Sequence, residues 1–185
     1  MIKINMRILI ENSLAVIIDM QEKLFAHMNN KETLENNTIK LVKGLNALDI
    51  PMIATQQYTK GLGTTIESVK ELLKGSPVIE KISFSCCDEP AFIEKLSSYN
   101  KKFIIIAGIE AHVCVLQTVM DLYSRGFIPV VIEDCISSRK NSDKNTALIR
   151  INKENAIIST YESILCELCR TAGTDIFKAV SKIIK

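Results

Sequence analysis

The chain has 185 residues, of which 47% are hydrophobic and 24% are charged, with a formal net charge of +2 at pH 7. This length predicts one domain over residues 1–185 that buries about 70% of its unfolded surface and needs no metal or disulfide to fold. The small net charge gives no reason to expect nucleic acid or a membrane as a partner, and we expect the charge-interrupted amino terminus not to be a signal peptide. We therefore expect a cytoplasmic protein.

The six cysteines do not form a disulfide or zinc pattern. Cys114 and Cys135 fall beside apolar strands, where reduced core thiols are the ordinary interpretation. The remaining pairs, at 86–87 and 166–169, lack the second C-x-x-C or paired histidines of a zinc site. The sequence therefore predicts no metal and no cofactor, and redox sensing through these pairs stays a minor alternative.

The first half of the chain alternates apolar runs with amphipathic stretches. The run at 14–19 is continuously apolar and closes with Asp19, as in a strand buried on both faces of a parallel sheet. The elements expected next, in chain order, are a helix at 30–48, a strand at 51–55, a polar loop at 56–65, a helix at 66–73, a weak strand at 78–79, and a helix at 88–99 capped by Asp88.

The central stretch at 103–133 predicts a strand, a turn opening with Gly108, a helix from about 112 to 125, and a second buried strand after Gly126. Cys114 lies in the first turn of that helix, where unpaired N–H groups and the helix dipole lower a thiol pKa. The elements expected after it are a polar loop at 134–145, a helix from Asp143 to about 153, a strand at 156–159, and helices at 160–170 and 174–184.

Strands that alternate with helices of ten or more residues predict an α/β fold. We expect a doubly wound, Rossmann-like three-layer sandwich, with a mostly parallel sheet of about six strands and helices on both faces. Ligands of such sheets bind outside the carboxyl ends of the strands. Four features converge on that edge: Asp19, the Gln57-Tyr58 loop, Lys81 and Cys114.

A thiolate nucleophile needs a proton acceptor and groups that hold an oxyanion. Asp19 is a candidate acceptor, because burial raises the basicity of a carboxylate, although it could merely cap or form a salt bridge. Lys81 could supply a cation beside it; the alternative, an exposed surface lysine, is the one that the sequence alone favours. Backbone N–H groups between Glu110 and Cys114 could form an oxyanion hole.

His112 precedes Cys114 by two residues, which suggests a cysteine–histidine pair. Residues at i and i+2 of a helix point apart, so the imidazole and the thiol should not meet. We interpret His112 as a residue of the helix start or the pocket wall. His27, the other histidine, has no evident partner in the sequence.

Three motifs carry a resemblance to a known family: L-A-V-I-I-D-M-Q at 14–21, V-I-E-K-I-S-F-S at 78–85 and A-G-I-E-A-H-V-C-V-L-Q-T at 107–118. With Q-Q-Y-T-K-G-L-G at 56–63 and D-C-I-S-S-R at 134–139, they resemble the isochorismatase-like cysteine hydrolase superfamily over nearly the whole chain. The closest resemblance is to the small isochorismatase domain-containing hydrolases.

The resemblance implies a catalytic triad of Asp19, Lys81 and Cys114. It also implies a cis peptide between Ile109 and Glu110, with an oxyanion hole made by the backbone N–H groups of Glu110 and Cys114. The loop after the second strand lacks the Asp and His ligands of the zinc-binding nicotinamidases of this superfamily, and Ala111 stands where Thr is common. The resemblance further implies a homo-oligomer, a dimer or larger.

The leading hypothesis is a hydrolase that cleaves a C–N bond of a small amide-like molecule through a thioester on Cys114. We expect Gln57, Tyr58, Ile109 and His112 to bind the substrate. The alternative hypothesis is a scaffold or regulatory oligomer that keeps the fold without turnover.

Overall fold

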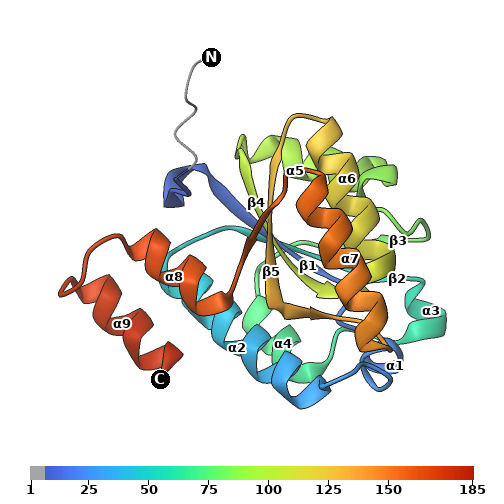
Figure 1. Cartoon of the computed structure of the whole chain (residues 1–185), viewed down its shortest axis with the longest axis horizontal. Coiled ribbons are helices and arrows are strands. Elements are labelled where there is room, and N and C mark those ends of the chain that lie inside the picture. Colours follow the sequence, from blue (N-terminus) through green and yellow to red (C-terminus); the bar gives the residue numbers. More distant parts are fainter. Residues whose placement is uncertain (1–6) are drawn as a thin grey trace.

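The computed structural model describes residues 7–185 and has a six-stranded sheet in the order β3-β2-β1-β4-β5-β6 (Figure 1). All of its neighbouring strands pair in parallel. The strands are β1 (Ser13–Ile18), β2 (Met52–Gln57), β3 (Val78–Lys81), β4 (Phe103–Ile109), β5 (Ile128–Ser137) and β6 (Ile157–Ser159). Residues 1–6, for which we expected no signal peptide, lie outside the described residues.

Helices cover both faces of the sheet, so the predicted three-layer, doubly wound fold is confirmed (Figure 1). One face packs against α2 (Lys31–Ala47), α4 (Glu67–Lys70), α8 (Tyr161–Cys169) and α9 (Asp175–Ile184), and the other packs against α5 (Pro90–Ser98), α6 (Leu116–Ser124) and α7 (Asn141–Lys153). Short helical turns are η1 (Ile10–Asn12), α1 (Glu22–Phe25), α3 (Thr59–Leu62), η2 (Glu71–Leu73), η3 (Cys86–Asp88) and the π-helix η4 (Ala111–Val115). Within residues 7–185, no helix is both long and apolar enough to cross a lipid bilayer.

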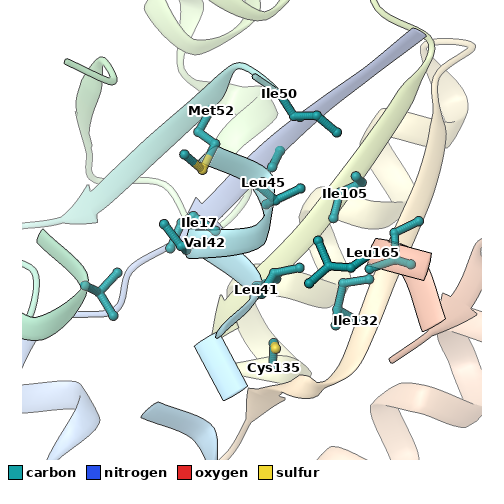
Figure 2. Packing of buried hydrophobic residues seen from close by; sticks show 14 of the residues in the cluster. Ile17, Leu41, Val42, Leu45, Ile50, Met52, Ile105, Ile132, Cys135 and Leu165 are labelled. Carbon is teal, nitrogen blue, oxygen red and sulfur yellow. The ribbon is translucent and has the colours of Figure 1, made fainter. Parts of the chain in front are cut away.

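Two hydrophobic layers sandwich the sheet because successive side chains of each strand point to opposite faces. On one face, Ile17 and Ile105 pack with Leu41 and Leu45 of α2 (Figure 2). On the other face, strand residues such as Val16 belong to the core formed with α5, α6 and α7. Burial on both sides explains why these strands read as continuous apolar runs rather than alternating ones.

Several predicted boundaries differ from the structure. Strand β2 extends to Gln57, into the loop expected at 56–65, and α7 begins at Asn141 rather than at Asp143.

Two further differences concern residues given a different role. The expected polar loop from 134 begins as strand, because β5 continues to Ser137 and pairs Ile136 with Gly108 after a shift in register. The helix expected at 88 begins at Pro90 with Glu89 as its N-cap residue, and Asp88 ends the preceding turn η3 instead of capping the helix. Proline suits the first turn of a helix, since its missing N–H would have no partner there.

The strand order places β1 and β4 side by side although β2 and β3 separate them in the chain. The chain therefore continues toward one edge of the sheet after β1 and toward the other edge after β4. This reversal is where α/β sheets open a crevice at the carboxyl ends of their strands. Asp19 follows β1 at this point, and the segment that carries Cys114 follows β4.

Candidate active site

Asp19 lies directly beyond β1 with its side chain completely buried. Its backbone has a φ of 49°, which turns the chain sharply at the end of the strand. Oδ1 accepts a hydrogen bond of 2.7 Å from Oγ1 of Thr55 on β2, and the backbone N–H of Asp19 donates to the carbonyl of Thr55 at 3.2 Å. The carboxylate is therefore held between β1 and β2.

Lys81 ends the edge strand β3, and its ammonium lies 2.6 Å from Oδ2 of Asp19. The contact is a close ion pair rather than a well-aligned hydrogen bond. Nζ also donates to Oε1 of Gln57 at 2.7 Å and to the carbonyls of Ser83 and Phe84, both at 3.1 Å. The interpretation of Lys81 as an exposed surface lysine was wrong, since the residue is 1% exposed.

The charge of Lys81 is secured by its neighbours. Burial by itself would lower the pKa of this ammonium. The negative charge of Asp19 is the strongest of the opposing effects, and together these effects raise the pKa above its ordinary value. Lys81 is therefore a cation at neutral pH. A buried pair of this kind keeps both charges only because each partner compensates the other.

Cys114 lies in the π-helix η4 and is 5% exposed, and its thiol is close enough to Asp19 for the negative charge of the carboxylate to raise the thiol pKa. The expected lowering of its pKa was wrong. Burial raises the pKa of this thiol to about 12, and the charge of Asp19 adds to the rise while Lys81 opposes it. Desolvation and the neighbouring anion raise the thiol pKa by more than the start of the helix lowers it. Cys114 is therefore a neutral thiol beside a carboxylate.

The segment between β4 and η4 is tightly constrained. The peptide bond between Ile109 and Glu110 is cis, and Gly108 has a φ of 127°. A Cβ atom on Gly108 would lie 2.0 Å from the carbonyl oxygen of Ile18, so only glycine allows β4 to approach β1 this closely.

Glu110 holds the start of η4 at both its backbone and its side chain. Its carbonyl accepts hydrogen bonds from the N–H groups of Val113 at 3.1 Å and Val115 at 3.2 Å. The residue is buried, and its carboxylate forms an ion pair with Nε of Arg139 at 3.0 Å. These contacts hold the segment that carries the backbone N–H groups of Glu110 and Cys114.

The four residues predicted to bind substrate have different surroundings. Gln57 bonds to Lys81, and Tyr58 is 49% exposed at the end of β2. Ile109 is completely buried, and His112 hydrogen-bonds through Nδ1 to Oγ of Ser138 at 2.9 Å, with Nε2 4.0 Å from Asp143. Their contribution to substrate binding stays a prediction.

Three polar residues of the site were missed from the sequence. Thr55 bonds to Asp19, and Cys86 lies with its Sγ 3.8 Å from Thr55. Gln21 is completely buried and bonds to the backbone of Gln57 through both ends of its amide, at 2.6 and 3.0 Å. Thr55 could have been indicated by its place at the end of the strand predicted at 51–55, beside the strand that closes with Asp19; nothing in the sequence indicates Cys86.

The part of the chain that the structure describes contains no group of three or more His, Cys, Asp or Glu side chains arranged to hold a metal ion. The polar side chains around Asp19 come instead from hydroxyl, amide, thiol and ammonium groups.

Comparison with known proteins identifies the family. The isochorismatase domain matches residues 13–163. Isochorismatase family protein 1B of Dictyostelium discoideum is 35% identical over 97% of this chain and 89% of its own length, and isochorismatase domain-containing protein 2A of Mus musculus is 33% identical over 97% and 85%. The solved structure of MAR1 ribonuclease from Caenorhabditis elegans is 36% identical, with a TM-score of 0.91 over 96% of this chain and 92% of that one. This chain therefore belongs to the isochorismatase family and has the fold of its hydrolases.

Proposed function

We propose that this protein is a cysteine-dependent hydrolase that cleaves the C–N bond of a small amide-like substrate. Cys114 is the nucleophile, Asp19 moves the proton, and Lys81 stabilises the charge of Asp19. The backbone N–H groups of Glu110 and Cys114 stabilise the oxyanion that forms on the substrate carbonyl.

The observation that carries this proposal is the buried pair of Asp19 and Lys81 next to the thiol of Cys114. One buried carboxylate lies 2.6 Å from the ammonium of Lys81 and close enough to the thiol of Cys114 for its charge to raise the thiol pKa. A nucleophile next to a base, with the base oriented by a third group, is the general arrangement of nucleophilic catalysis.

In the first half of the reaction, the sulfur of Cys114 attacks the carbonyl carbon while its proton passes to Asp19. The C–S bond forms and the carbonyl oxygen becomes an oxyanion. The tetrahedral intermediate then collapses, the C–N bond breaks, and protonated Asp19 gives its proton to the leaving nitrogen. An amine or ammonia departs, and a thioester remains on Cys114.

In the second half, a water molecule gives a proton to Asp19, and the oxygen of that water attacks the carbonyl carbon of the thioester. The C–S bond breaks, the carboxylic acid leaves, and the proton returns to the sulfur. Because burial and Asp19 hold the pKa of the thiol at about 12, sulfur stays protonated between turnovers. In the proposed reaction the proton therefore passes to Asp19 as the sulfur attacks.

The test uses ammonia release from a panel of small aliphatic and aromatic primary amides. The wild type should hydrolyse at least one, and Cys114→Ala should lose at least about 1,000-fold in rate with an unchanged circular dichroism spectrum. Cys166→Ala, at an exposed thiol, is the matched control and should keep full activity. Undiminished activity of Cys114→Ala would exclude the mechanism, and a wild type inert on the whole panel would favour the scaffold alternative.

A second candidate substrate is RNA, because a protein 36% identical to this chain is described as a ribonuclease. The two candidates are separated by incubating a labelled RNA with the wild type and with Cys114→Ala prepared in parallel. Cleavage that depends on Cys114 would support RNA as a substrate. Equal cleavage by both preparations would indicate a contaminating nuclease.

A further inference from the structure

We propose that Thr55 and Cys86 form a buried hydrogen-bond relay that fixes the carboxylate of Asp19, the base for the proton of Cys114. The inference rests on the proposed function, since it concerns the base of that reaction. Thr55 and Cys86 are positioning residues, because they act through Asp19.

The first link of the relay joins Thr55 to Asp19. Oγ1 of Thr55 donates to Oδ1 of Asp19 at 2.7 Å, and the two residues are 1% and 0% exposed. A hydrogen bond to an ionised group in a dry site is stronger than one between neutral groups. This bond holds Oδ1 while the ammonium of Lys81 lies beside Oδ2, so each oxygen of the carboxylate has a protein partner of its own.

The second link joins Cys86 to Thr55, and its direction follows from the first. An ionised carboxylate can only accept hydrogen bonds, so the single hydroxyl proton of Thr55 is committed to Asp19. Sγ of Cys86 lies 3.8 Å from Oγ1 of Thr55 and must therefore be the donor. Burial supports this role, because it raises the pKa of the Cys86 thiol to about 12 and keeps the proton on sulfur.

Cys86 is itself fixed from the opposite side of the site. Its backbone N–H donates to Oγ1 of Thr118 on α6 at 3.0 Å, and both residues are completely buried. The relay therefore runs from α6 through η3 and β2 to the base at the end of β1. The ionisable groups that face Asp19 along this path and from β3 and η4 are Cys86, Lys81 and Cys114.

The test follows the rate of alkylation of Cys114 by iodoacetamide against pH, measured by peptide mass spectrometry, and needs no substrate. In the wild type the rate should fall at acid pH, and Asp19→Asn should abolish this acid limb because it removes the carboxylate. Thr55→Val removes a donor to the carboxylate, so the limb should move up by about one pH unit. Thr55→Ser restores the hydroxyl and should return the limb to its wild-type position.

Matched variants separate the relay from simple packing. Thr38→Val makes the same change at an equally buried threonine of α2 and should leave the limb in place. Cys86→Ala should move the limb in the same direction as Thr55→Val but by less, and Cys86→Ser should match the wild type. Thermal melting of each variant reports any loss of folding.

Failure of this inference is distinguishable from failure of the proposed function. If Asp19→Asn abolishes the limb but Thr55→Val leaves it unmoved, the relay is wrong and Asp19 remains the base. If the limb moves as expected but no amide is hydrolysed, the relay stands and the proposed reaction is wrong. If Asp19→Asn does not change the limb, both are overturned.

Discussion

The ammonium of Lys81 lies 2.6 Å from the carboxylate of Asp19, and both side chains are completely buried. Each charge compensates the other, and removing either one would leave an unpaired ion in the interior. The pair thus links the stability of the fold to the proposed chemistry of the site.

Lys81→Met should lower the free energy of unfolding by about 3–5 kcal/mol, because Asp19 would be left as a buried, unpaired anion. The double variant Asp19→Asn with Lys81→Met should recover a large part of this loss, since no charge then remains to desolvate. Urea denaturation measures both effects. Equal stability of Lys81→Met and the wild type would contradict the account of the pair.

Gln57 should act through Lys81 rather than through substrate, because its Oε1 accepts from Nζ at 2.7 Å. Gln57→Leu should therefore lower kcat by about 10-fold and leave KM within about 2-fold of the wild type. Tyr58→Phe, at the neighbouring exposed residue, should leave kcat unchanged, so that any effect of this variant is on KM. Steady-state kinetics distinguish the two, and a rise in KM alone for Gln57→Leu would instead support its predicted role in substrate binding.

Gly108→Ala should be severely destabilising, because its Cβ would lie 2.0 Å from the carbonyl oxygen of Ile18. Gly126→Ala is the matched control: φ there is also positive, at 85°, but no atom lies within 4 Å of the added carbon. The control should lose about 1–2 kcal/mol from backbone strain alone, and Gly108→Ala considerably more. Similar urea midpoints for the two variants would contradict this prediction, since they would show that β4 can move away from β1 and make room for the added carbon.

Stability should fall at alkaline pH because buried thiols resist ionisation. The pKa values of Cys86, Cys87 and Cys114 are raised to about 12, chiefly by burial, whereas a thiol in the unfolded chain ionises near about 8.5. The folded state therefore binds more protons above pH 9, and the free energy of unfolding should decrease by about 1.4 kcal/mol per pH unit for each thiol. Below about pH 8 all three are protonated in both states and contribute no slope.

Urea denaturation between pH 8 and pH 10 checks this slope. Cys87→Ala removes one buried thiol and should make the slope shallower by about 1.4 kcal/mol per pH unit. Cys166→Ala removes an exposed thiol and should leave the slope unchanged. A slope that does not respond to Cys87→Ala would contradict burial as its cause.

The sequence by itself determined the layers of the fold and the edge at which the candidate site lies. Apolar runs such as the one ending at Asp19 predict strands buried on both faces, and helical periodicity between them predicts the covering helices. The carboxyl ends of parallel strands share one edge, so Asp19, Lys81 and Cys114 could be assigned to that edge without coordinates. The motifs around them also sufficed to indicate the family.

Only the tertiary structure decided the environment of each polar group. Periodicity shows which face of an element is apolar, but desolvation depends on atoms that distant segments bring together. The burial of Lys81, the raised pKa of Cys114 and the bond from Thr55 to Asp19 all arise in this way. For the same reason, the helix start alone gave the wrong direction for the thiol pKa: burial and the charge of Asp19 come from the assembled sheet edge.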